Sequence, residues 1–73
     1  MRVKEITEGA VTLRIRTFER KTPAGFPYFE SRGSYKSPDA PCTIHLVTRT
    51  TNVSAERAEL EMVSVARRHG WGR

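Results

Sequence analysis

The chain has 73 residues; 37% are apolar, and 13 Lys and Arg against 8 Asp and Glu give a net charge of +5. This length allows one domain, and the apolar fraction is too high for a disordered tail. The longest apolar run has two residues, so we expect a cytoplasmic protein with neither a transmembrane helix nor a signal peptide. A single cysteine excludes a disulfide framework and a four-thiolate zinc site.

Residues 1–9 mix charges of both signs with two β-branched apolar side chains. That pattern fits a short edge strand, because flanking charges discourage aggregation at a sheet edge. It fits a loose terminus equally well. The sequence leaves both readings of this segment open.

Residues 10–20 form the clearest predicted strand. Alternate positions place three aliphatic side chains on one face: Val11, Leu13 and Ile15. The other face carries Thr12, Arg14, Arg16 and Phe18. A helix would scatter the aliphatic side chains around its circumference, so the alternation favours a strand. The chain then breaks, because Pro23 lacks an amide donor and Gly25 tolerates positive φ.

Residues 26–32 and 42–50 are the other two predicted strands. The first is aromatic, and Pro27 places its start late or at a sheet edge. Residues 33–41 have the Gly, Ser and Pro content of a loop. The last strand should place Cys42, Ile44 and Leu46 on one face and His45, Val47 and Arg49 on the other.

Residues 54–69 predict a helix with matching signals at both ends. Ser54 is a good N-cap and Gly70 a good stop. A stripe at helical spacing consists of Ala55, Ala58, Met62, Val65, Ala66 and His69. Trp71, just beyond the stop, is placed to fold back onto this stripe.

The predicted architecture is one α+β domain spanning residues 1–73. It has an antiparallel sheet of three strands, or four if residues 1–9 pair, packed against one C-terminal helix. The helix should cover the sheet face built by Val11, Leu13, Ile15, Ile44 and Leu46.

Positive charge is concentrated in two segments. Residues 12–21 carry a net charge of +3, and residues 67–73 also carry +3. We interpret the second segment as helix capping, because cations complement the carbonyl end of a helix. The first lies on the strand face that the helix should leave open, beside an aromatic ring. That combination suits phosphate contact with base stacking, or docking on an acidic protein, and an ordinary solvated face is the competing reading.

The candidate partner-binding residues combine this basic face with the N-terminal edge. They are Arg2, Val3, Lys4, Ile6, Arg14, Arg16, Phe18, Arg20 and Lys21.

No set of residues predicts catalysis or metal binding. Cys42 and His45 would point to opposite faces of a strand, so they cannot form a nucleophile–base pair there, and we expect Cys42 to be a small buried residue. His45 and His69 lack zinc-site spacing. We therefore expect a non-enzymatic, monomeric protein without a cofactor.

In size, basic balance and one-domain build, the whole chain resembles the small early proteins by which lytic bacteriophages control host RNA polymerase. The resemblance carries no short motif. It implies a transcription regulator that binds bacterial RNA polymerase in the host cytoplasm, inhibits initiation and promotes antitermination, with nucleic acid nearby.

The order of elements is similar to that of a second family, the arm-type DNA-binding domains of tyrosine integrases. The segments that carry this likeness are Val11–Phe18, Phe26–Ser31, Thr43–Arg49 and Ser54–His69. It implies a DNA-binding module that lays a three-stranded sheet into a groove.

Overall fold

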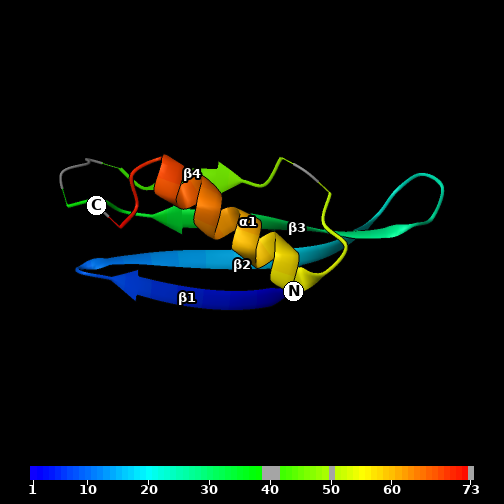
Figure 1. The fold of residues 1–73 in the computed structure, drawn as a ribbon, viewed down its shortest axis with the longest axis horizontal. Coiled ribbons are helices and arrows are strands. Elements are labelled where there is room, and N and C mark those ends of the chain that lie inside the picture. The colour runs from blue at the N-terminus through cyan, green and yellow to red at the C-terminus, as the bar shows by residue number, and fades with distance from the viewer. Residues whose placement is uncertain (39–41, 50, 73) are drawn as a thin grey trace.

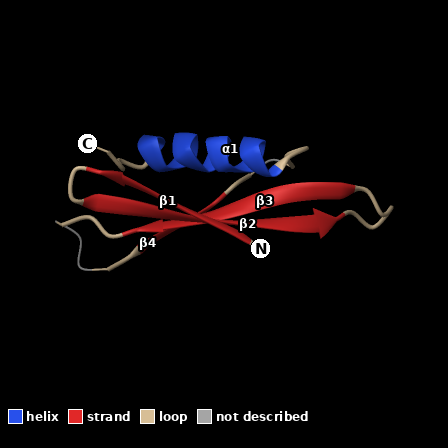
Figure 2. Cartoon of the chain, turned by 90° about the horizontal axis from the view of Figure 1, so that it is seen from below, coloured by secondary structure: helices blue, strands red, loops and turns tan. Residues whose placement is uncertain are grey.

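The computed structural model describes residues 1–38, 42–49 and 51–72. Its elements are β1 (Arg2–Glu8), β2 (Val11–Lys21), β3 (Pro27–Tyr35), β4 (Ile44–Val47) and α1 (Ala55–Arg68). The strands form an antiparallel sheet in the order β1-β2-β3-β4, and α1 lies across one face of it (Figures 1 and 2). This confirms the α+β class and the C-terminal helix. Residues 1–9 contribute a strand, so the sheet has four.

β1 and β2 are joined by a tight turn that only a few residues can make. Gly9 has φ 61°, in the left-handed region that glycine adopts without a side-chain clash. The turn sets the register, in which Lys4 lies opposite Ile15 and Ile6 opposite Leu13. Because opposed residues share a face, Lys4 and Ile6 lie on the side of the sheet that carries α1.

β3 continues to Tyr35, so the prediction of a loop beginning at residue 33 is wrong. Gly33 lies opposite Leu46 within the sheet, under the helix. A Cβ there would stand 2.5 Å from the Met62 Sδ. Glycine at this position therefore allows close packing of α1 on the strand rather than a turn.

β4 is shorter than the predicted 42–50 strand, of which Thr50 lies outside the described residues. After Val47 the chain stays near β3: the Thr48 N–H donates to the Ser31 carbonyl at 3.0 Å, and Asn52 pairs with Phe29. Cys42 precedes the strand and is exposed, which corrects the expectation that it is buried. Its position before the first ladder pair keeps its side chain out of the core.

α1 begins and ends where its sequence signals indicate. The Ser54 hydroxyl accepts a hydrogen bond from the Arg57 N–H at 3.2 Å, and Gly70 has φ 108° beyond the last turn. The predicted stripe is buried at four positions: Ala58, Met62, Val65 and Ala66. Ala55 is half-buried and His69 is exposed, because these two lie at the ends of the helix.

Trp71 folds back and joins the core, as its position predicts. It is 2% exposed and clusters with Leu13, Ile15, Tyr35, Met62 and Ala66. The backbone N–H of Trp71 donates to the Ala66 carbonyl at 3.0 Å, and the Tyr35 hydroxyl donates to the His69 carbonyl at 3.1 Å. These bonds hold the C-terminal end of α1 on the sheet.

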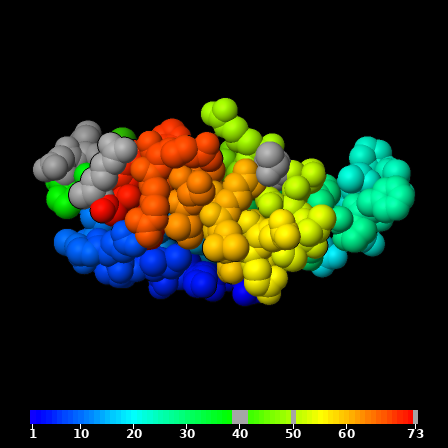
Figure 3. Space-filling model, viewed as in Figure 1, coloured from blue at the N-terminus to red at the C-terminus, as the bar shows by residue number. Residues whose placement is uncertain are grey.

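The β2–β3 hairpin makes the molecule elongated, with principal extents of 44 × 19 × 18 Å. Its tip projects past the helix in all three whole-molecule views (Figures 1–3). Within the described ranges, no helix has the length and apolar character needed to cross a bilayer.

Candidate functional site

The sheet has one face under α1 and one face that the helix leaves uncovered. Leu13, Ile15 and Thr17 point toward the helix and are buried, so the alternate residues of β2 point the other way. We call the uncovered side the open face. The strand register assigns to it these charged and aromatic side chains: Glu5, Arg14, Arg16, Phe18, Arg20, Tyr28, Glu30, Arg32 and His45.

Two arginines face each other at the centre of this surface. Arg16 on β2 lies directly opposite Arg32 on β3. Among the described residues no carboxylate forms an ion pair with either of them. Like charges at directly opposed positions destabilise a sheet, so this pair contributes nothing favourable to folding by electrostatics. An anion bound between the two guanidinium groups would reverse that cost.

An aromatic ring lies beside the arginine pair. The guanidinium carbon of Arg20 lies 5.0 Å from the centroid of the Phe18 ring, and that of Arg32 lies 5.9 Å away. Arg20 also donates from Nε to the Glu30 carboxylate at 2.7 Å. The ring therefore orients two planar cations, of which Arg32 keeps its forked donors for a ligand, whereas Arg20 uses its Nε on Glu30.

A hollow of ≈ 490 Å³ lies beside these residues. Its lining is Arg16, Arg32, Gly33, His45, Leu46 and Val47. Two arginines and a histidine supply hydrogen-bond donors, and Val47 adds an apolar wall that is 49% exposed. Such a surface can hold a phosphate group or the edge of a base.

The N-terminal candidates are split between the two faces of the sheet. Val3 lies on the open face, opposite Arg16. The register places Arg2, Lys4 and Ile6 on the helix side, away from the basic row. These residues therefore cannot join Arg14 and its neighbours in one contact surface, as a single binding face would require.

Arg2 already has partners within the chain. Its guanidinium lies 3.1 Å from Glu56 and 3.2 Å from Glu59, and Glu59 is buried. The pKa of Glu56 is lowered, first by the Glu56 backbone N–H in the opening turn of α1 and then by Arg2. Arg2 thus ties β1 to the start of the helix.

The other end of β1 is tied to the end of the helix. Arg67 donates to both carboxylate oxygens of Glu8, at 3.0 and 2.5 Å, and its guanidinium carbon lies 4.9 Å from the Trp71 ring centroid. The hydrogen bond from Arg67 lowers the pKa of Glu8 and raises that of Arg67. Part of the C-terminal positive charge is therefore structural; Arg73, also in that segment, lies outside the described residues.

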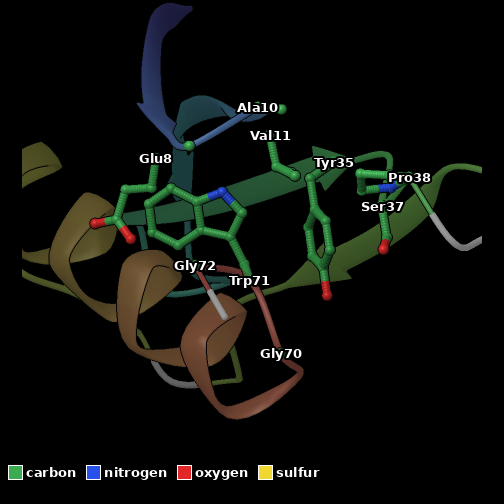
Figure 4. Close-up of a pocket in the computed structure, with 10 residues that line it drawn as sticks. Glu8, Ala10, Val11, Tyr35, Ser37, Pro38, Gly70, Trp71 and Gly72 are labelled. Atoms are coloured by element: carbon green, nitrogen blue, oxygen red, sulfur yellow. The ribbon is translucent and has the colours of Figure 1, made fainter.

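A pocket of ≈ 350 Å³ opens beside Trp71 (Figure 4). Glu8 and Tyr35 line it, but the Glu8 carboxylate is bound by Arg67 and the Tyr35 hydroxyl donates to His69. The charged group of this pocket is thus already engaged, so we do not place the functional site here.

The structure differs from the predicted set of binding residues at two positions, because Lys21 lies outside the open-face row and Arg32 lies within it. Lys21 lies opposite Pro27 at the base of the hairpin tip, outside the open-face row. Arg32 is missing from the sequence-based set although it lies at the centre of the surface. The sequence could have indicated Arg32 through the alternation of side chains along residues 26–32. That alternation places Arg32 on the open face only once the strand is paired with β2 through a short loop.

The described residues contain no group of three or more His, Cys, Asp or Glu side chains that could hold a metal ion. Comparison of the chain with protein-family models, with curated proteins and with solved structures finds no match. The functional argument therefore depends on the geometry of the open face.

Proposed function

We propose that this chain is a non-enzymatic DNA-binding module that lays the open face of its sheet into the major groove of a duplex. The observation that carries the proposal is the opposed Arg16–Arg32 pair, of which Arg16 is half-buried and Arg32 exposed, and which has no carboxylate partner among the described residues. Four arginines and an aromatic ring share that face, while α1 covers the other.

The dimensions of β2 and β3 suit this binding mode. Neighbouring strands lie ~4.8 Å apart, and the major groove, ~12 Å wide, admits a two-stranded ribbon. The sheet narrows to such a ribbon beyond the Val3–Arg16–Arg32–Val47 row, toward the hairpin tip. Alternate residues of a strand repeat every ~6.8 Å, which is two base-pair steps of ~3.4 Å. Arg14 and Arg16 are so spaced, and their guanidinium groups can reach phosphates two steps apart on one strand or the O6 and N7 of guanine.

The kind of cation supports the same conclusion. Ten of the thirteen basic residues in the sequence are arginine. Arginine binds phosphate and guanine through two parallel hydrogen bonds, whereas lysine acts as a point charge. The stacking of Arg20 and Arg32 on Phe18 keeps part of this row ordered before DNA arrives.

Salt-dependent duplex binding tests the proposal. Fluorescence anisotropy of a labelled duplex of about 20 base pairs should give a plot of log affinity against log salt with a negative slope. If Arg14, Arg16 and Arg32 each contact one phosphate, that slope is about −2.7. Absence of duplex binding at low salt would remove the proposal.

A second candidate function is regulation of bacterial RNA polymerase by direct binding. The specific observation in its favour is that β1 is a seven-residue edge strand with mostly exposed side chains. An edge strand offers backbone donors and acceptors to an added strand of a partner. Docked there, the chain would still present its open face to nucleic acid on the polymerase.

Purified polymerase distinguishes the two candidates. The second one predicts co-elution of the protein with bacterial RNA polymerase at both low and moderate salt, and inhibition of initiation or read-through of a terminator in a defined transcription assay. Failure to co-elute under both conditions counts against it, and leaves the duplex-binding proposal untouched.

A further inference from the structure

The tip of the β2–β3 hairpin carries a large apolar side chain that the fold does not use. Phe26 is 69% exposed. The hairpin tip projects beyond the end of α1, and no other element lies beside it in Figures 1 and 2. Aromatic side chains, Phe among them, are enriched in binding interfaces relative to the rest of a protein surface.

The loop at the tip is closed by hydrogen bonds that fix the position of Phe26. The Thr22 N–H donates to the Phe26 carbonyl at 2.9 Å, and the Gly25 N–H donates to the Thr22 carbonyl at 2.8 Å. The Phe26 N–H in turn donates to the Thr22 side-chain oxygen at 3.1 Å. Pro23 and Pro27 restrict the backbone on either side of this bonded loop. An ordered loop loses little conformational entropy when its side chain inserts.

The surroundings of Phe26 favour nucleic acid as the partner. Lys21 lies across the base of the loop, opposite Pro27, and is exposed. On the strands that lead to the tip, Arg20 is the next cation and is paired with Glu30, and Arg16 and Arg32, whose charge attracts phosphates, lie further along. A cation beside an aromatic ring can bind a phosphate while the ring stacks on the neighbouring base. Apolar side chains can also wedge between base steps of a duplex.

We infer that Phe26 is a wedge that inserts at a base step of duplex DNA and bends it, with Lys21 on the adjacent phosphate. This inference depends on the proposed DNA-binding function and adds a bending activity to it. Pyrimidine–purine steps such as TA unstack most easily, so the tip should prefer duplexes that contain one. Apolar wedges that enter from the minor groove kink a duplex by roughly 20–90°, and entry of Phe26 from the major groove, which the sheet occupies, should also bend it.

Two labelled duplexes and three proteins test the wedge. A duplex of about 24 base pairs, with a central TA step and a donor and acceptor dye at its ends, reports affinity by anisotropy and bending by energy transfer. The proteins are the unmodified chain, Phe26→Ala and Leu60→Ala. Leu60 is a matched control, because it is 68% exposed and lies on α1, which is on the opposite side of the sheet from the open face. The second duplex replaces the TA step with a stiff A-tract.

The unmodified chain and Leu60→Ala should raise energy transfer on the TA duplex and less so on the A-tract. Phe26→Ala should bind about tenfold more weakly, since a stacked base contributes ~1–3 kcal/mol, with the same salt slope and no rise in energy transfer. Equal affinity and equal energy transfer for Phe26→Ala and the unmodified chain would overturn the wedge while leaving DNA binding intact. Failure of the unmodified chain to bind either duplex would instead overturn the proposed function, and the wedge with it.

Phe26→Trp supplies an independent measurement. The new indole is exposed, whereas Trp71 is buried and gives a constant background. Stacking on bases should quench the added fluorescence and protect it from iodide. An added indole that stays accessible to iodide in the bound complex would contradict insertion.

Discussion

Replacing Gly33 by alanine should destabilise the fold measurably, because the helix packs directly on that position. A Cβ there would stand 2.5 Å from the Met62 Sδ, 3.0 Å from the Met62 Cγ and 3.4 Å from the Leu13 Cδ1. Favourable contacts between such atoms lie near 3.5–4.0 Å, so the overlap with sulfur is about 1 Å. Met62 is 0% exposed, so its side chain can move only within a close-packed core.

The expected loss follows from two opposing effects. Overpacking of this kind costs about 1–3 kcal/mol, and alanine is better than glycine within a strand by about 0.5–1 kcal/mol. The free energy of unfolding should therefore fall by about 1–2 kcal/mol for Gly33→Ala. In a domain of this size each kcal/mol corresponds to about 4–8 °C, so Tm should fall by about 5–15 °C.

Urea and thermal unfolding followed by circular dichroism would measure this loss. The set should include Met62→Ala and the double variant, in which the new methyl group occupies space that the shortened side chain vacates. The double variant should then lose less than the two single losses added together, by at least about 0.5 kcal/mol. Ser34→Ala is the control, since this neighbour lies on the open face and should change stability by no more than about 0.5 kcal/mol. Gly33→Ala with unchanged Tm, or strict additivity in the double variant, would refute the close packing.

Three further predictions concern the ends of β1, the buried polar pair and the thiol. Because Arg67 lowers the pKa of Glu8 below 4.5, their ion pair stabilises the fold above that pH and this stabilisation is lost as the pH falls. In urea unfolding, Glu8→Gln should thus be less stable than the unmodified chain at about pH 7 and nearly as stable at about pH 3. The same difference in the free energy of unfolding at both pH values would contradict the ion pair. Ser31→Ala leaves the buried Thr17 hydroxyl without the hydrogen-bond partner that lies 2.8 Å away, so the free energy of unfolding should fall by about 1–3 kcal/mol. Adding Thr17→Val to that variant should recover part of the lost stability. A further fall in the double variant would argue against the hydrogen bond. Cys42 is exposed, so a maleimide should label it without denaturant, and labelling only in urea would show that it is buried.

The sequence was sufficient for the elements whose signals are local. The alternation of Val11, Leu13 and Ile15 predicts β2 and its buried face, and the Ser54 cap and Gly70 stop predict α1. Each of these depends on the periodicity or capping chemistry of a single segment. Such signals need no knowledge of what packs against them.

The incorrect predictions concern positions whose structure is decided by contacts with residues that are distant in the sequence. Gly33 has loop chemistry in isolation, but the approach of Met62 makes it a strand residue. Cys42 resembles a core residue, but β4 begins after it. In both cases tertiary contacts override the conformation that the local sequence favours.

The candidate site was half predictable for a related reason. The basic face of β2 follows from alternation within one strand, but Arg32 joins it only through the pairing of β2 with β3. Charge and a place at the sheet edge put the N-terminal residues in the predicted set, and neither feature tells which face of the sheet their side chains share. Pairing of β1 with β2 places Arg2 and Lys4 on the helix side.

The most direct test of the account compares two double variants that remove the same charge from different faces. Arg16→Gln with Arg32→Gln empties the centre of the open face, and Arg57→Gln with Arg68→Gln removes two exposed cations from α1. Measured on one duplex across a range of salt concentrations, the open-face variant should flatten the plot of log affinity against log salt by about 1.8. The helix variant should leave the slope near that of the unmodified chain. Equal flattening by the two variants would show that binding follows net charge alone, and would contradict a defined DNA-binding face.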